Sequence, residues 1–329
     1  MAIQVTDLHL LREQLLLRRQ KLEPVVSRAQ TANLLQLLEQ VDKALERVEA
    51  GSFGICEVCH GTLEAQRVLA DPLARVCLDC LPPAEARALE RDLELAASIQ
   101  AGLLPPRDFA ASGWKAALHY EPAGMVSGDY CDLVPHGNDL YFMLGDVSGK
   151  GVAASMLMSN LHAMFRALVP SGLPLPELVE RANRLFCGST LPTQYATLIC
   201  GKAKPCGDVE ISNSGHLAPL HVSPKGVRAI EANTVPVGLF CDQTFSSTHV
   251  QLSPGDSLVL FSDGITESFS PDGAEYGSHR LASLLSQCLS RGSRELVEDC
   301  IRDVAAFRGA SPRFDDQTLL VLSFAPVQH

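Results

Sequence analysis

Acidic side chains next to glycine recur in four segments of the C-terminal part of the chain. The segments are MVSGDYCDLV with Asp129 and Asp132, FMLGDVSGKG with Asp146, LVLFSDGITES with Asp263 and Glu267, and RFDDQTLLVL with Asp315 and Asp316. Each acid lies at the boundary of an apolar run with the pattern of a strand, although aspartate is a poor strand former. Gathered carboxylates repel one another, and a pair of hard divalent cations is the simplest way to stabilise them. Oxygen ligands favour Mg²⁺ or Mn²⁺ over Zn²⁺.

Two such ions about 4 Å apart can bridge a water, lower its pKa and hold a phosphoryl group for in-line attack. The pattern therefore predicts direct hydrolysis by hydroxide, without a covalent intermediate. The sequence contains neither a G-x-S-x-G elbow nor a C-x5-R arrangement, so it does not indicate a nucleophilic side chain. Any one of the four acidic segments alone is more typical of an ordinary turn, and the prediction depends on all four together.

Four cysteines form a second candidate site with the spacing C-x2-C-x17-C-x2-C. They are Cys56, Cys59, Cys77 and Cys80. Each pair offers two thiolates from one turn, and the four together complete a tetrahedron around Zn²⁺. Because the protein would fill every position, we predict a closed structural zinc site that helps a short segment to fold. The adjacent His60 is outside this spacing and is expected to be solvated.

Apolar periodicity indicates the elements that position these groups. Residues 1–50 are expected to form a helical hairpin, residues 51–83 a zinc finger, residues 84–106 a linker helix and residues 107–326 a catalytic domain. In the last domain, helices are predicted over 152–168, 176–187, 277–289 and 294–307. Strands are predicted at HYEP, DYCDLV, LYFMLGDV, QYATLICG, DVEIS, SLVLFSD and QTLLVLSF. Short turns between them favour antiparallel sheets in a layered α+β fold.

The composition of the 329 residues is that of a folded protein, with 46% hydrophobic residues and a net charge of -11. It excludes a chain that is disordered throughout, and the acidic balance argues against nucleic-acid binding. The longest uncharged stretch, residues 185–201, is interrupted by proline and glycine, so no membrane span is expected. We also expect no signal peptide. Eleven cysteines favour a metal site plus buried thiols in a reducing cytoplasm.

The acidic segments resemble those of the PPM-type, protein phosphatase 2C-like serine/threonine phosphatases, in particular the SpoIIE/RsbU branch. The resemblance covers about residues 90–325 and includes SIQAGLLPP, PAGMVSGDYCDL, GDVSGKGVAASMLMS, YATLICG, ISNSGHLAPL, LVLFSDGITES and DDQTLLVL. It implies an α/β/β/α sandwich that hydrolyses phosphoserine or phosphothreonine with two Mn²⁺ or Mg²⁺ ions. The metal ligands that it implies are Asp129, Asp146, Asp263 and Asp315, with the backbone carbonyl of Val147. The substrate that it implies is a STAS-domain anti-sigma-factor antagonist in a partner-switching pathway.

For the other polar residues of these segments, other roles are expected. Asp316 is a candidate to support the site rather than bind metal, and the same role or a strand-end role is expected for Asp132 and Glu267. His216 is expected to make structural hydrogen bonds, with catalysis as the alternative. Lys150 either assists phosphate binding or is a solvated loop residue. The eukaryotic relatives carry a histidine where Ser148 stands here, so the proton donor to the leaving serine oxygen is unassigned.

The cysteine segment, GSFGICEVCHGTLEAQRVLADPLARVCLDC, resembles the zinc finger of the DksA/TraR family. Members of that family can bind RNA polymerase through a coiled coil with acidic residues at its tip. Here the corresponding turn, LEPVVSRAQTANLL, has only Glu23. We therefore expect the N-terminal region to serve regulation and homodimerisation. Two alternatives remain open: a transcription regulator that binds RNA polymerase, and an inactive scaffold that binds phosphoproteins.

Overall fold

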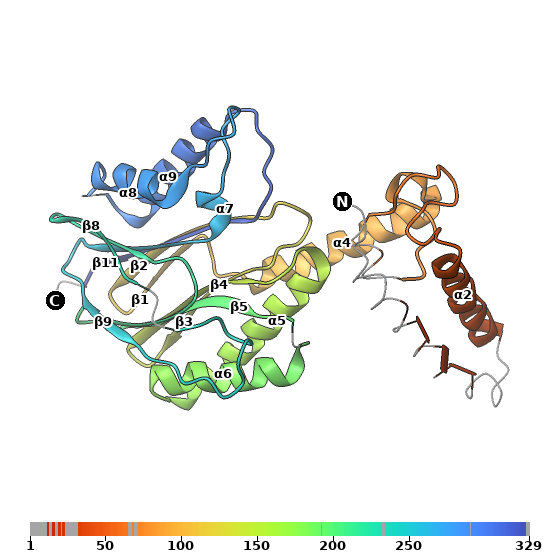
Figure 1. Cartoon of the computed structure of the whole chain (residues 1–329). Coiled ribbons are helices and arrows are strands. Elements are labelled where there is room, and N and C mark those ends of the chain that lie inside the picture. Colours follow the sequence, from red (N-terminus) through yellow and green to blue (C-terminus); the bar gives the residue numbers. More distant parts are fainter. Residues whose placement is uncertain are drawn as a thin grey trace. The chain divides into compact units, whose positions relative to one another are not determined.

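The computed structural model divides into two units, Met1–Asp92 and Leu93–His329, and each is described by itself (Figure 1). The structure describes residues 12, 15–16, 19–20, 22–23, 32–64, 68, 72–191, 193–231, 234–289 and 291–326. Helix α4 (Pro83–Leu103) is the predicted linker helix, and the division between the units falls inside it. The predicted domain boundaries stay predictions.

In the first unit, α2 (Ala32–Glu49) is the second helix of the predicted hairpin. Its buried face carries Val41, Ala44 and Leu45, at the spacing of an amphipathic helix. The helix ends where expected, because Gly51 adopts a left-handed φ of 67° that glycine reaches without strain. The first predicted helix of the hairpin lies largely outside the described residues.

The second unit contains a six-stranded sheet with the order β1-β2-β11-β10-β7-β8. Its strands are β1 (Asp108–Ala111), β2 (Trp114–Glu121), β11 (Gln317–Phe324), β10 (Ser257–Phe261), β7 (Leu220–Ser223) and β8 (Gly226–Ala229). Every paired strand in this sheet is antiparallel to its neighbour. The predicted antiparallel pairing is therefore confirmed here.

A five-stranded antiparallel sheet with the order β3-β4-β5-β6-β9 faces the first. Its strands are β3 (Asp129–His136), β4 (Asp139–Val147), β5 (Ala196–Ala203), β6 (Asp208–Ser214) and β9 (Thr248–Gln251). The strand pattern did not predict β1, β7, β8 or β9. Each of these has four residues, too few for a clear alternation of apolar and polar positions.

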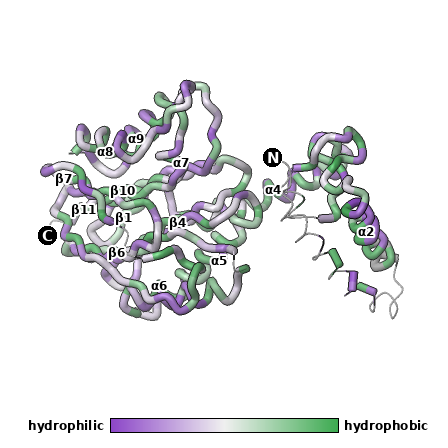
Figure 2. The backbone as a smooth tube through the Cα atoms, viewed as in Figure 1, coloured by the Kyte–Doolittle hydropathy of each residue, from purple (hydrophilic) through white to green (hydrophobic). Residues whose placement is uncertain are grey.

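Alternate residues of the strands supply separate layers of the core. Leu320 and Leu322 of β11 pack between the two sheets, whereas Leu319 and Val321 face the helices outside. Figure 1 shows helices on both outer faces, and in Figure 2 hydrophobic colour follows the central strands. The helices are α5 (Gly151–Leu168) and α6 (Leu175–Ser189) on one side, and α8 (Gly277–Ser286) and α9 (Ser293–Arg308) on the other, with the short α7 (Asp263–Thr266) after β10. The predicted α/β/β/α sandwich is confirmed.

One helical stretch in the described part of the chain, Gly151–Ser171, is long and apolar enough to cross a membrane. In this fold it covers the five-stranded sheet, and Met158, Leu161 and Phe165 are fully buried against that sheet and α6. A core helix has the same composition, so this stretch is weak evidence for a span.

Candidate metal centres

Asp129 and Asp146 come from neighbouring strands of the five-stranded sheet. Asp129 opens β3, Asp146 is the penultimate residue of β4, and the two are direct partners in the register. Only 1% of Asp129 is exposed, and Thr318 Oγ1 of the opposite sheet donates a hydrogen bond of 2.5 Å to its Oδ2. Burial, with repulsion from Asp146, raises the pKa of Asp129 well above its usual value.

The six-stranded sheet supplies Asp263 and Asp315 at the same end of the sandwich. Asp263 opens α7 directly after β10, and Asp315 lies two residues before β11, the neighbour of β10. The close approach requires Gly264, because a Cβ there would lie 2.0 Å from the carbonyl oxygen of Asp316. Burial and repulsion from Asp315 raise the pKa of Asp263. Burial raises the pKa of Asp146 to about 7, with added repulsion from Asp263 and Asp315, so carboxylates from both sheets interact.

The donor set of this acidic cluster is all oxygen, which fits Mg²⁺ or Mn²⁺. A Cβ at Gly128 would lie 3.2 Å from the Val147 carbonyl oxygen and 3.5 Å from Asp146 Oδ1, so glycine leaves the space beside both oxygens open. Among the described residues, no three carboxylates have oxygens all within 4.8 Å of one another. Two ions whose shells are completed by water fit such a spread of ligands better than one ion held by three carboxylates.

Asp316 is occupied with the loop between β2 and β3. It accepts hydrogen bonds from the backbone nitrogens of Ala123 at 2.7 Å and Gly128 at 3.0 Å, and from Ser127 Oγ at 2.7 Å. Ser127 Oγ in turn accepts a hydrogen bond of 3.0 Å from the backbone nitrogen of Asp129. Asp316 therefore holds the loop that leads into Asp129.

Asp132 does not join the acidic cluster, although it shares a segment with Asp129. It lies on the opposite face of β3, fully buried, and Arg166 of α5 donates two hydrogen bonds of 2.7 and 2.6 Å to its carboxylate.

Two further predicted residues differ in their relation to the cluster. Glu267 is exposed, and its pKa is raised first by desolvation and then by repulsion from Asp263. Lys150 is brought to the cluster, where its Nζ lies 2.7 Å from Asp315 Oδ2.

His216 uses both ring nitrogens for contacts that connect the sheets. Nε2 lies 3.1 Å from the carbonyl oxygen of Phe261, so Nε2 must carry the proton. Nδ1 then accepts from Thr197 Oγ1 at 2.7 Å. Burial lowers the pKa of His216 to about 4, which keeps the ring neutral. These contacts are those of the structural role that the sequence favours.

Sequence reasoning did not single out Gln100, the one buried residue of α4. Its amide clamps the backbone of Ser127, with Nε2 donating to the carbonyl oxygen at 2.7 Å and Oε1 accepting from the nitrogen at 3.0 Å. Ser127 is also hydrogen-bonded to Asp129 and Asp316, so this one residue connects α4 to both aspartates. Gln100 lies in the quoted segment SIQAGLLPP, but an isolated polar residue in a helix is usually exposed.

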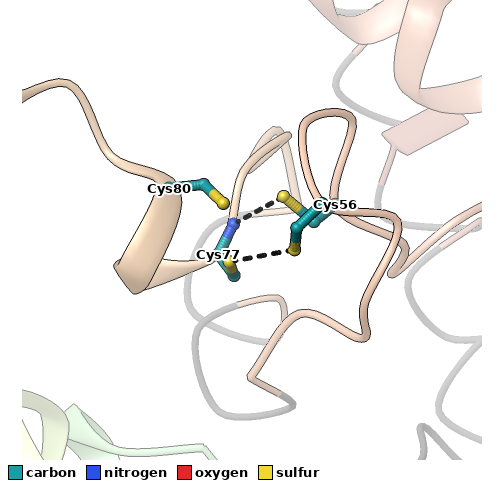
Figure 3. A group of neighbouring side chains, drawn as sticks. Cys56, Cys77 and Cys80 are labelled. Atoms are coloured by element: carbon teal, nitrogen blue, oxygen red, sulfur yellow. Dashed lines mark hydrogen bonds between the residues drawn. The ribbon is translucent and has the colours of Figure 1, made fainter.

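In the first unit, the four predicted cysteines converge. Their sulfur atoms all lie within 4.8 Å of one another, which no other group of three or more such side chains in the described ranges achieves. Figure 3 shows Cys77 and Cys80 across from Cys56. Hydrogen bonds from backbone N–H groups to the sulfur lower the pKa of Cys56 to about 6, and the one from Cys59 has the largest effect. A lowered pKa favours the thiolate, which is the form that binds a cation. The donor set fits a closed tetrahedral zinc site.

The two-sheet sandwich with acids at one end is the architecture of the PP2C-like phosphatases. The SiaA-PP2C domain of Pseudomonas aeruginosa superposes with a TM-score of 0.65 at 18% identity, over 73% of this chain and 98% of that one. Residues 136–325, more than half of the chain, match the family model described as Stage II sporulation protein E (SpoIIE). The chain therefore belongs to the SpoIIE family. Residues 51–86 match the model of the prokaryotic dksA/traR C4-type zinc finger.

Two curated relatives resemble most of the chain. Protein IcfG of Synechocystis sp. is 25% identical over 261 residues, which are 70% of this chain and 41% of that protein. Phosphoserine phosphatase RsbU of Bacillus subtilis is 24% identical over 237 residues, 71% of this chain and 70% of RsbU. The match therefore spans less than half of IcfG but more than two thirds of RsbU.

Proposed function

We propose that this protein is a metal-dependent phosphatase that hydrolyses phosphoserine or phosphothreonine on a regulatory protein. The observation that carries the proposal is the convergence of Asp129, Asp146, Asp263 and Asp315 from both sheets at one end of the sandwich. Asp129 is buried and the other three are half-buried, and the mutual repulsion of these carboxylates is unfavourable unless cations bind there. We propose two Mn²⁺ or Mg²⁺ ions at this centre and one structural Zn²⁺ at the cysteines.

The four aspartates and the Val147 carbonyl would hold the ions. When bound, the ions would supply a water of lowered pKa for in-line attack on phosphorus. The chain's own contribution is positional. Thr318 orients the carboxylate of Asp129, and Asp316 holds the loop that precedes it.

The proposed substrate is a phosphorylated STAS-domain anti-sigma-factor antagonist in the cytoplasm. Membership of the SpoIIE family and the similarity to RsbU, which is named a phosphoserine phosphatase, support phosphoserine as the group that is hydrolysed, and the STAS-domain partner is what the resemblance to the SpoIIE/RsbU branch implies. The net charge of -11 argues against nucleic acid as a partner.

We also propose that the N-terminal region regulates the phosphatase through α4. The support is the clamp of Gln100 on Ser127, because a shift of this helix would move the loop before Asp129. Homodimerisation through the helical segments is part of the same proposal. Leu95 and Ile99, one turn apart on α4, are 62% and 60% exposed, an apolar face that a second copy could cover.

Asp263→Asn tests the proposed activity. With p-nitrophenyl phosphate and Mn²⁺, and then with candidate phosphoproteins, we expect the rate to fall about 100-fold or more, because an amide binds a hard cation poorly. Asp272→Asn, which changes an exposed aspartate in the following turn, is the matched control and is expected to leave the rate unchanged. A wild-type rate in Asp263→Asn, with folding retained, would refute the proposal.

Gln100→Ala tests the coupling through α4, with the exposed Ser98→Ala on the same helix as its control. We expect Gln100→Ala to change the phosphatase rate several-fold, because the Ser127 backbone loses two hydrogen bonds. Equal rates in both variants and in wild type would contradict the proposed route of regulation.

A further inference from the structure

Lys150 places a positive charge inside the acidic cluster. It lies in the loop between β4 and α5, four residues after Asp146, and its side chain reaches the segment before β11 of the other sheet. There Nζ lies 2.7 Å from Asp315 Oδ2 and donates to the carbonyl oxygen of Phe314 at 2.9 Å. The ion pair therefore crosses between the two sheets at the end of the sandwich where the four aspartates meet.

Lys150 pairs with a carboxylate of the cluster, because its Nζ lies 2.7 Å from Asp315 Oδ2. Opposite charges attract more strongly where a site is partly shielded from water. Lys150 thus contributes part of the positive charge that a divalent cation would contribute to the same carboxylate.

The two oxygens of Asp315 are held in different ways. Oδ1 accepts a hydrogen bond of 3.0 Å from the backbone nitrogen of Asp316, which the fold keeps in place. Oδ2 is held by Lys150, whose side chain is 53% exposed and flexible. A cation that binds Oδ2 competes with the ammonium group, because two positive charges on one carboxylate oxygen repel each other.

We propose that Lys150 competes with a divalent cation for Asp315 Oδ2, and that the displaced ammonium group binds the phosphoryl group of the substrate. This inference rests on the proposed function, because it takes Asp315 to be a metal ligand. A lysine ammonium is a compact charge on a flexible stem and commonly binds phosphate. One residue would thereby shield the carboxylates before the cation binds and neutralise the phosphoryl group afterwards.

Lys150→Met tests both parts, because methionine keeps an unbranched apolar stem and removes the charge. Free Mn²⁺ is measured by electron paramagnetic resonance during titration of the zinc-loaded full-length protein. We expect the dissociation constant for Mn²⁺ to fall about three- to fivefold, the range for loss of one partly exposed ion pair. At saturating Mn²⁺ we expect kcat/KM for p-nitrophenyl phosphate to fall about tenfold, since the phosphoryl group loses a charged partner.

Lys204→Met is the matched control, because Lys204 pairs with Asp208 at 2.8 Å on the same sheet outside the cluster. It is expected to change neither quantity. Unchanged or weaker Mn²⁺ binding by Lys150→Met overturns the competition, and an unchanged kcat/KM overturns the phosphoryl contact. A wild type that neither binds Mn²⁺ nor hydrolyses the substrate overturns the proposed function as well, which separates the two failures.

Discussion

Replacing Asp146 by asparagine is expected to stabilise the fold while it abolishes the proposed activity. Burial and the neighbouring acids raise the pKa of Asp146 from 3.8 to about 7. The folded protein therefore keeps a proton that the unfolded chain has released, and stability falls as the pH rises from about 4 to about 7. A shift of about 3 units corresponds to about 4 kcal/mol, and partial exposure to solvent reduces this to about 2 kcal/mol.

Trp114 provides the assay, because it is the single tryptophan and is buried in the sandwich. Urea unfolding is followed by its fluorescence at pH 8 and pH 5, in zinc-loaded protein without Mn²⁺ or Mg²⁺. Asp146→Asn should be about 2 kcal/mol more stable than wild type at pH 8, with a smaller difference at pH 5. Asp272→Asn, the exposed control, should match wild type at both pH values. Equal or lower stability of Asp146→Asn at pH 8 would show that repulsion does not dominate this cluster.

Three further outcomes follow from the site. The pKa of His216 is about 4 in the folded protein and 6.5 in the unfolded chain. Between pH 6.5 and pH 4 the unfolded chain therefore binds more protons, and the free energy of unfolding falls by about 3 kcal/mol as the pH is lowered through this range. In His216→Gln, the urea midpoint that Trp114 fluorescence reports should decrease less over this pH range than in wild type. An equal decrease in both proteins would contradict the lowered pKa of His216. Gly264→Ala places a Cβ 2.0 Å from a backbone oxygen, so it should lower the free energy of unfolding by about 1–3 kcal/mol and abolish activity. Gly292→Ala, which has open space around the new Cβ, should do neither. Equal effects of the two substitutions would exclude the steric argument. Cys77→Ser should release zinc and unfold the finger in proteolysis, while the Trp114 transition stays in place; a shifted transition would show that the two units unfold together.

The sequence predicts the layered architecture well because most strands and helices have strong apolar periodicity. The strands that it misses are short: β1, β7 and β9 each pair with a longer strand, and β8 pairs with the equally short β7. Local pattern carries little information about such pairing.

The sequence could predict which segments form the acidic centre. It could not predict which acid of each segment faces the cluster and which one supports a neighbouring loop. Asp129 and Asp132 differ by three positions in one strand, so they must face opposite sides, and this parity could have separated them from sequence alone. No comparable rule distinguishes Asp315 from Asp316, since both precede β11 and their partners come from distant loops. The clamp of Gln100 on Ser127 depends on how α4 packs, which periodicity does not determine.

The two proposed metal centres relate to folding in different ways. The cysteines lie within residues 56–80, so zinc can organise a short segment locally. The acids extend from residue 129 to residue 315 and are contributed by both sheets, so this proposed ligand set exists only once the sandwich has formed. A cation that binds only the folded sandwich stabilises it by mass action, by about 2.7 kcal/mol at a hundredfold excess over the dissociation constant. Such binding would offset the repulsion that burial of the aspartates imposes, so the fold can retain carboxylates that destabilise it in the absence of the cation.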